Sequence, residues 1–157
     1  MHDSLENGRK FRSLNIIDDY NREALEIVVD YSIPGEQVVR ILQQLIEWRG
    51  KPEFIRKDNG PEFQKLFEQF CRDNGITPIK TQPGKPSQNG YVERFNRTLR
   101  EDVYDAHIFT NLAEVRQVIE DWMDDYNYYH PHDGIGGMTP KEFMAVNCGK
   151  HAHAKAS

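Results

Sequence analysis

The sequence predicts one α/β domain built on a mixed sheet with helices on both faces. Strand-like segments come first, and segments of helical periodicity then alternate with short strands. A length of 157 residues with 38% hydrophobic content suits a single core. We expect this domain to span residues 1–146, and residues 147–157 to form a disordered tail.

The amino-terminal part of the sequence predicts antiparallel strands. Residues 10–31 are rich in aliphatic and β-branched side chains and are interrupted by a polar segment at 18–22, which is the pattern of a hairpin. The dipeptide Asn7-Gly8 is a turn signal and predicts a further strand before it. Only a stub of that strand is present, so we expect the first strand to be incomplete.

The remaining sequence predicts helices that alternate with short strands. Apolar residues recur at spacings of three and four in the segments 34–49, 63–74, 91–103 and 112–126, and a short helix is expected at 141–146. Short strands are expected at 53–56 and 76–79. Residues 81–90 hold prolines and glycines without apolar periodicity, so they predict a loop.

The composition excludes two classes of protein. No apolar run approaches the roughly 18 residues of a membrane span, and no charged-then-apolar segment marks a secretory signal at the amino terminus. We therefore expect a soluble intracellular protein. Cys71 and Cys148 are isolated and lack metal-ligand spacing, which fits unpaired thiols in a reducing compartment.

Charge is distributed unevenly along the chain. The formal net charge is -5, which argues against attraction of nucleic acid to the whole surface. Residues 76–100, however, hold five basic residues and one acidic residue, and residues 101–125 hold eight acidic residues and one basic residue. A polyanion could dock on one face while another repels it. Chance variation in surface charge explains the same distribution equally well.

Two carboxylates are candidates for metal chemistry. Asp58 follows a predicted strand, at the position where open α/β sheets commonly place active sites, and Glu93 lies on a helix 35 positions later. Hard carboxylate oxygens brought together by folding are the ligands that Mg²⁺ or Mn²⁺ requires, and two such ions support in-line phosphoryl displacement. The structural alternative is an Asx turn at Asp58 and an i,i+4 ion pair between Glu93 and Arg97.

Several blocks of sequence resemble insertion-sequence transposases with an integrase core. Residues 57–63 read KDNGPEF and residues 82–96 read QPGKPSQNGYVERFN, like the second and third signature blocks of that family. Residues 11–23, FRSLNIIDDYNRE, resemble its early hairpin, and DYN at 125–127, PH at 131–132 and TPKEF at 139–143 resemble its carboxyl-terminal block. The family pattern usually has arginine where this chain has His130.

The resemblance implies a ribonuclease-H-like fold that carries an Asp-Asp-Glu metal triad. Asp58 and Glu93 match its second and third members, with Mg²⁺ or Mn²⁺ in a two-metal site. The family's first aspartate lies on the opening strand and would fall just before Met1, so the site is expected to be incomplete. Asp3 lies about four residues after the expected position of that aspartate, which on a strand is a displacement of ~13 Å, so it is a poor substitute. Asp18 and Asp19 match family positions at the end of the next strand, where a hairpin-turn role is favoured over metal binding.

Further polar residues flank Glu93 and are candidates for contact with DNA. They are Lys85, Gln88, Asn89, Arg94, Arg97 and Arg100, on the predicted loop and the exposed helix face. Ordinary loop and surface chemistry is the alternative explanation for all of them. A zinc site built from His130, His132, His151 and His153 is disfavoured, because two of these lie in the predicted tail and no cysteine has ligand spacing.

Three functional hypotheses follow. The first is a transposase integrase core of the bacterial cytoplasm, in the form of an amino-terminally truncated fragment. It would cleave and transfer DNA strands in a metal-dependent reaction, and its partners would be transposon ends and target DNA. We expect it to form a homodimer and to bind neither a membrane nor a small-molecule substrate. The second is an inactive transposase remnant that only binds DNA or a partner subunit. The third is a ribonuclease that cleaves RNA in hybrids, which the blocks after Glu93 disfavour.

Overall fold

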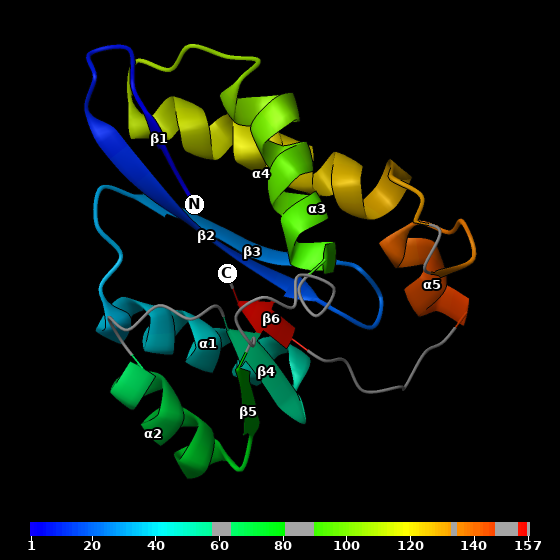
Figure 1. Ribbon diagram of the computed structural model, residues 1–157. Coiled ribbons are helices and arrows are strands. Elements are labelled where there is room, and N and C mark those ends of the chain that lie inside the picture. The colour runs from blue at the N-terminus through cyan, green and yellow to red at the C-terminus, as the bar shows by residue number, and fades with distance from the viewer. Residues whose placement is uncertain (58–63, 81–89, 133–134, 147–153, 157) are drawn as a thin grey trace.

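The computed structural model describes residues 1–57, 64–80, 90–132, 135–146 and 154–156. A six-stranded mixed sheet forms its middle layer, with α3 and α4 on one face and α1 and α2 on the other (Figure 1). The elements are β1 (His2–Ser4), β2 (Lys10–Asp18), β3 (Ala24–Asp30), α1 (Gly35–Arg49), β4 (Phe54–Lys57), α2 (Gln64–Asn74), β5 (Thr77–Lys80), α3 (Gly90–Leu99), the π-helical turn η3 (Arg100–Tyr104), α4 (Leu112–Tyr129), α5 (Pro140–Val146) and β6 (Ala154–Ala156). The predicted layers are confirmed.

The first three strands form the predicted antiparallel arrangement. β1 pairs with β2 from His2 opposite Arg12 onward, and Gly8 makes the connecting turn with φ of 85°, a conformation that glycine adopts without steric cost. β2 pairs with β3 from Arg12 to Ile17, with an irregularity in register between Ile16 and Ile17, so the hairpin expected within residues 10–31 is confirmed. Its turn includes Arg22 with φ of 64°, an uncommon conformation for a residue that carries a Cβ.

The second half of the sheet is parallel. β4 pairs with β5 in parallel register, and α2 makes the crossover between them. Val38 and Leu42 of α1 pack with Phe67 and Phe70 of α2 against the lower face of the sheet. The predicted strands and helices are therefore present, with bounds that differ from the predictions by a few residues.

β6 is the one strand that the sequence did not predict. It lies between β2 and β4, antiparallel to β2 and parallel to β4, so it joins the two halves of the sheet. Residues 151–156 alternate alanine with polar residues, but they include no β-branched or aromatic side chain, and alanine is depleted in strands. The position of β6 instead depends on backbone hydrogen bonds to strands on both sides, and composition does not report these.

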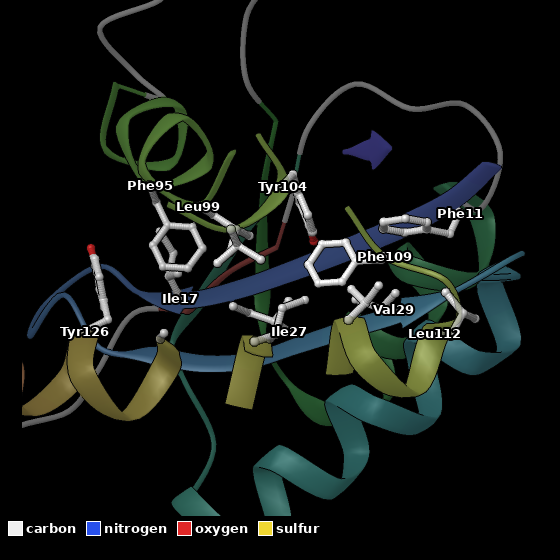
Figure 2. Close-up of a cluster of buried hydrophobic side chains, with 14 of the residues drawn as sticks. Phe11, Ile17, Ile27, Val29, Phe95, Leu99, Tyr104, Phe109, Leu112 and Tyr126 are labelled. Carbon is white, nitrogen blue, oxygen red and sulfur yellow. The ribbon is translucent and has the colours of Figure 1, made fainter. Parts of the chain in front are cut away.

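Alternation along β2 separates two apolar cores. Phe11 and Ile17 point toward α3 and α4, whereas Leu14 and Ile16 point toward α1 and α2. Figure 2 shows the first core, in which Phe11, Ile17, Ile27, Val29, Phe95, Leu99, Tyr104, Phe109, Leu112 and Tyr126 meet between the sheet and the helices. Because β2 is covered on both faces, each of its side chains has a fixed side of the sheet.

Two buried polar groups fasten the hairpin to the helices. The side chain of Asn127 on α4 accepts from the backbone N–H of Ala24 at 2.8 Å and donates to its carbonyl at 3.0 Å. The carboxylate of Glu23, only 3% exposed, receives two hydrogen bonds from Arg49 at 2.6 and 2.7 Å and one from Lys141 at 2.8 Å. The two groups tie β3 to α4, and the turn to α1 and α5.

Within the part of the chain that the structure describes, no helix is long and apolar enough to cross a membrane. The longest, α4, has acidic residues distributed along its exposed face.

Asn127→Ala tests the attachment of α4 to β3. The substitution removes both partners of the Ala24 backbone in a buried place, so we expect it to lower the free energy of unfolding by about 2 to 4 kcal/mol in urea titration. Gln117→Ala is the matched control, because Gln117 is exposed on the same helix and its side chain bonds that of Asp121, one turn away. It should change stability by less than about 0.5 kcal/mol. Equal losses in both variants would contradict the assignment.

Candidate functional site

Helix α3 presents Glu93 on its solvent side. Val92, Phe95 and Leu99 are buried in the first core, at the spacing of one helical face. Glu93 and Arg97 are exposed, and the structure forms no ion pair between them although it describes both residues. The i,i+4 pair considered as the structural alternative for Glu93 is therefore not formed.

A pair of amides, buried at Asn15 and half-buried at Asn96, connects this helix to the sheet. The side chain of Asn15 on β2 is 1% exposed and donates to the side-chain oxygen of Asn96 on α3 at 2.8 Å. Ser13, also buried, donates to the oxygen of Asn15 at 2.7 Å. Asn96 lies one helical turn after Glu93, so this contact fixes the height of Glu93 above the sheet.

The carboxyl end of β4 lies close to Asn15 of β2 in its position along the sheet. Lys57 is paired with Ala156 of β6, and Ala156 is paired with Ile16 of β2. The residue after Lys57 is Asp58, the second predicted metal ligand, and it lies outside the described residues. The end of β4 is therefore one residue from the level of Asn15, which bonds α3.

The predicted cations have different surroundings. Arg94 and Arg97 are exposed on α3. Arg100 donates to the backbone carbonyl of His2 at 2.7 Å and lies 3.8 Å from the carboxylate of Asp105, so it also anchors β1. The other predicted contacts, Lys85, Gln88 and Asn89, lie outside the described residues.

A polar cavity of about 230 Å³ lies beside α3, and the sequence did not predict it. Its wall includes Arg22 from the hairpin turn, Arg94 from α3 and His130 and His132 from the segment after α4. Tyr91 forms part of this wall, and its hydroxyl bonds that of Tyr126 at 2.6 Å. The stretch at 130–132 thus packs against the start of α3, since the rings of His132 and Tyr91 lie edge to face with centroids 5.9 Å apart.

Asp18 is a buried carboxylate on the opposite face of β2. Burial raises its pKa to about 6, although the backbone N–H groups of Tyr20 and Asn21 donate to it. The hairpin-turn role expected of Asp18 agrees with these two bonds. Asp18 also borders a cavity of about 450 Å³ that is lined mainly by apolar residues of β2, β3 and α1.

Among the described residues, no group of three or more His, Cys, Asp or Glu side chains is arranged to hold a metal ion. The zinc site disfavoured from the sequence has two of its histidines, His151 and His153, outside this part of the chain. Glu93 is described and exposed, whereas Asp58 is not described.

Sequence reasoning missed the contact between Asn15 and Asn96. The available signal is a single amide side chain within the apolar run of residues 14–17, because a polar group inside a strand covered on both faces needs a partner. The identity of that partner depends on the fold, since the two asparagines are 81 positions apart.

Comparison with solved structures gives the fold its class. The catalytic core of HTLV-2 integrase, solved in complex with magnesium, superposes with a TM-score of 0.68 at 19% identity, covering 91% of this chain and 90% of that one. The catalytic core of BIV integrase superposes with a TM-score of 0.66 at 25% identity, covering 94% and 91%. The fold is therefore the ribonuclease-H-like fold of retroviral integrase catalytic cores.

Sequence comparison identifies the family. A profile described as an integrase core domain matches residues 1–86, and a second profile of the same description matches residues 74–140. The chain belongs to the integrase core domain family. It is 42% identical over 144 residues to proteins of insertion elements IS476 of Xanthomonas euvesicatoria and IS407 of Burkholderia multivorans, and 23% identical to the putative transposase InsK of Escherichia coli.

The chain spans only part of these relatives. The match covers 91% of this chain, but 42% of the IS476 protein and 52% of the IS407 protein. For InsK the corresponding shares are 87% and 50%. The predicted resemblance to insertion-sequence transposases is confirmed at the level of the core domain.

Asp18→Asn tests the cost of burying this carboxylate. The pKa of Asp18 is raised from 3.8 to about 6 on folding, so the folded state binds the proton more tightly and stability falls as pH rises between these values. Above pH 6 the penalty is fully present. The amide keeps the acceptor oxygen, so we expect the variant to be more stable by about 1 to 3 kcal/mol at pH 7 and equal to the parent chain near pH 3.5. Thermal unfolding at both pH values measures this, and a loss of stability at pH 7 would contradict it.

Proposed function

We propose that this chain is the core of an insertion-sequence transposase and acts on DNA by divalent-metal-dependent strand cleavage and transfer. Asp58 and Glu93 are its metal-binding carboxylates. The observation that carries the proposal is that the end of β4 lies one residue from the level of Asn15 on β2, which bonds Asn96, one helical turn after Glu93 on α3.

The side-chain directions support the same site. Ile55 of β4 packs in the core on the α1 and α2 face, so by strand alternation the even-numbered positions of β4 belong to the α3 face. Asp58 has an even number and follows β4 directly. A carboxylate there and the exposed carboxylate of Glu93 would face one another across the top of the sheet.

The donor set fits a hard divalent cation. Carboxylate oxygens are the ligands that Mg²⁺ and Mn²⁺ prefer, and Asp58 and Glu93 would hold the ion. When bound, such an ion activates a water or 3′-hydroxyl and stabilises the leaving oxygen of a phosphodiester. The protein's own contribution is to hold α3 at a fixed height over β2 through Asn15 and Asn96, so that Glu93 is positioned before DNA arrives.

The DNA backbone is proposed to follow the exposed side of α3. Arg94 and Arg97 supply positive charge beside Glu93, and Lys85, Gln88 and Asn89 precede the helix in the sequence. The exposed acidic residues of α4 would repel DNA from the surface of that helix. Transposon ends and target DNA are the proposed partners, and a homodimer would bring two ends together.

A specific observation favours a second candidate, a protein that binds DNA without cutting it. The observation is the pair of exposed arginines on α3, Arg94 and Arg97, which can contact phosphate groups without a metal ion. Asp3 is on β1, where its Cα is paired with that of Phe11, four residues along β2 from Asn15. Under this alternative the chain would keep the DNA contacts and lack strand cleavage.

Strand cleavage distinguishes the two candidates. We expect the chain extended by the strand segment that precedes it in a longer transposase to nick duplex DNA carrying transposon ends in the presence of Mn²⁺. Asp58→Asn and Glu93→Gln should each reduce the rate by about 100-fold or more, because each removes a charged metal ligand. Equal nicking by the extended parent and both variants would contradict the assigned carboxylates.

DNA binding by the chain as given tests the proposed surface. We expect fluorescence anisotropy to show affinity for duplex DNA that falls steeply with salt, and Arg94→Ala and Arg97→Ala each to weaken it by about three- to tenfold and to reduce the salt slope by about one. Arg40→Ala is the matched control, since Arg40 is exposed on α1, on the opposite face of the sheet. An equal effect of the control would contradict the assigned surface.

A further inference from the structure

The cavity of about 230 Å³ beside α3 has a wall of one electrostatic sign. Among the described residues, this wall has no carboxylate but four groups that can carry positive charge: Arg22, Arg94, His130 and His132. Three separate parts of the chain supply them, namely the turn after β2, helix α3 and the segment after α4. Positive groups that approach from three sides repel one another unless an anion lies between them. The wall therefore suits an anionic ligand.

Arg22 is held in place at the edge of this cavity. Its φ of 64° is uncommon for a residue with a Cβ, and such conformations persist where the surrounding structure fixes them. The Tyr91 hydroxyl donates to the Arg22 carbonyl at 2.8 Å, and the guanidinium lies over the Tyr91 ring, 4.4 Å from its centroid. A bond of 2.9 Å to Asp19, which is not part of the wall, uses one Nη1 donor. A guanidinium has five N–H donors, so others can serve a ligand.

The tyrosine hydroxyls in the wall are already engaged. A hydroxyl has one proton, and Tyr91 donates its proton to the Arg22 carbonyl, so Tyr126 is the donor in the 2.6 Å bond between the tyrosines. Burial raises the pKa of Tyr126 to about 12, although the bond with Tyr91 and the charges of the two arginines, Arg22 and Arg94, oppose the rise. Both guanidinium groups therefore act on this one hydroxyl. The arginines and the imidazole rings are the donors that a ligand would meet.

The size of the cavity selects a small group. Pockets that take a whole drug-sized ligand measure about 300 to 1,000 Å³, so a cavity of about 230 Å³ suits one phosphate group rather than a complete nucleotide. Arg94 and Thr98, one turn apart on α3, both line it. Glu93 and Arg97, also one turn apart, lie on the neighbouring flank of the helix. The cavity is thus next to the flank that carries Glu93 and is separate from it.

We propose that the four positive groups of this cavity bind a backbone phosphate of DNA. The inference rests on the proposed interaction with DNA, but it requires neither a metal ion nor strand cleavage. It extends the DNA surface from the exposed flank of α3 to the hairpin turn and to the segment after α4. A phosphate held there would fix the path of one DNA strand beside α3 and would leave the carboxylate of Glu93 free for its own ligand.

Inorganic phosphate tests the cavity without DNA. We expect NMR to show saturable shifts of the imidazole signals of His130 and His132 when phosphate replaces chloride at constant pH and ionic strength. His107 is the matched control, because its ring is exposed and bonds the carbonyl of Val103. Arg22→Gln should weaken phosphate binding by about fivefold or more, since it removes a charged donor. Equal shifts of all three histidines, absence of saturation, or an unchanged affinity in the variant would overturn the site.

Arg9→Gln controls for the loss of an arginine that lies over a tyrosine ring. The guanidinium of Arg9 is 3.5 Å from the centroid of the Tyr31 ring, and Arg9 precedes β2 whereas Arg22 follows it. At ~3.3 Å per residue, the nine residues of β2 separate the two arginines by about 30 Å. Arg9→Gln should therefore leave the affinity for phosphate and for DNA unchanged. An effect as large as that of Arg22→Gln would contradict a local site.

A gain of affinity tests DNA as the source of the phosphate. His130→Arg gives the wall a permanent charge with five donors, so we expect it to bind duplex DNA at least about threefold more tightly in EDTA, measured by fluorescence anisotropy. Arg22→Gln should bind at least about threefold more weakly under the same conditions. A misfolded variant cannot produce the gain. Unchanged DNA affinity in both variants would overturn DNA as the ligand.

The ends of the DNA distinguish a backbone phosphate from a terminal one. Adding a 5′-phosphate to the duplex should change none of these affinities, and effects confined to phosphorylated ends would overturn the backbone assignment. The metal site is judged separately. If His130→Arg and Arg22→Gln act as expected in EDTA while Glu93→Gln leaves Mn²⁺-dependent nicking intact, the phosphate cavity is correct and the proposed metal site is wrong. If only Glu93→Gln has its expected effect, the cavity is wrong and the metal site stands.

Discussion

The coverage of β2 on both faces is the constraint on which the rest of the structure depends. From Ser13 to Asp18 every residue of this strand is buried, and alternate residues enter different cores. A slip of one residue would send Leu14 and Ile16 into the core of α3 and α4 and would bury Phe11 and Ile17 on the wrong side. The register is therefore fixed by apolar packing. Asn15 has its place facing α3 as a consequence.

This single register links parts of the chain that are remote in the sequence. β3 and β1 take their positions directly from β2, and β4 takes its position through β6. Helix α3 is placed by Phe95 and Leu99 in the first core and by Asn96 on Asn15. The buried amide contact contributes little net stability compared with the apolar residues around it. Its role is to select one position of α3 over β2, because any other position would leave the buried amide of Asn15 without this hydrogen bond and lower the stability of the fold.

Most of the architecture could be predicted from periodicity, because the hairpin, the four main helices and the parallel strands each bury a regular apolar pattern. The two blocks around Asp58 and Glu93 also predicted the family. What could not be predicted depends on long-range partners. β6 consists of alanine and lysine, which are depleted in strands, and exists through backbone pairing with β2 and β4. The cavity formed by Arg22, Arg94 and the histidines after α4 brings together segments that are about 110 residues apart in sequence.

A double-mutant cycle on Asn15→Ala and Asn96→Ala tests the central claim most directly, since it measures the contact that fixes α3 over β2. Urea unfolding of the parent chain, the two single variants and the double variant gives the coupling energy between the side chains. The account predicts a favourable coupling of about 1 to 2 kcal/mol, with the single losses clearly larger than the additional loss in the double variant. Strictly additive losses would show that the two amides do not interact, and would contradict the placement of Glu93 over the sheet.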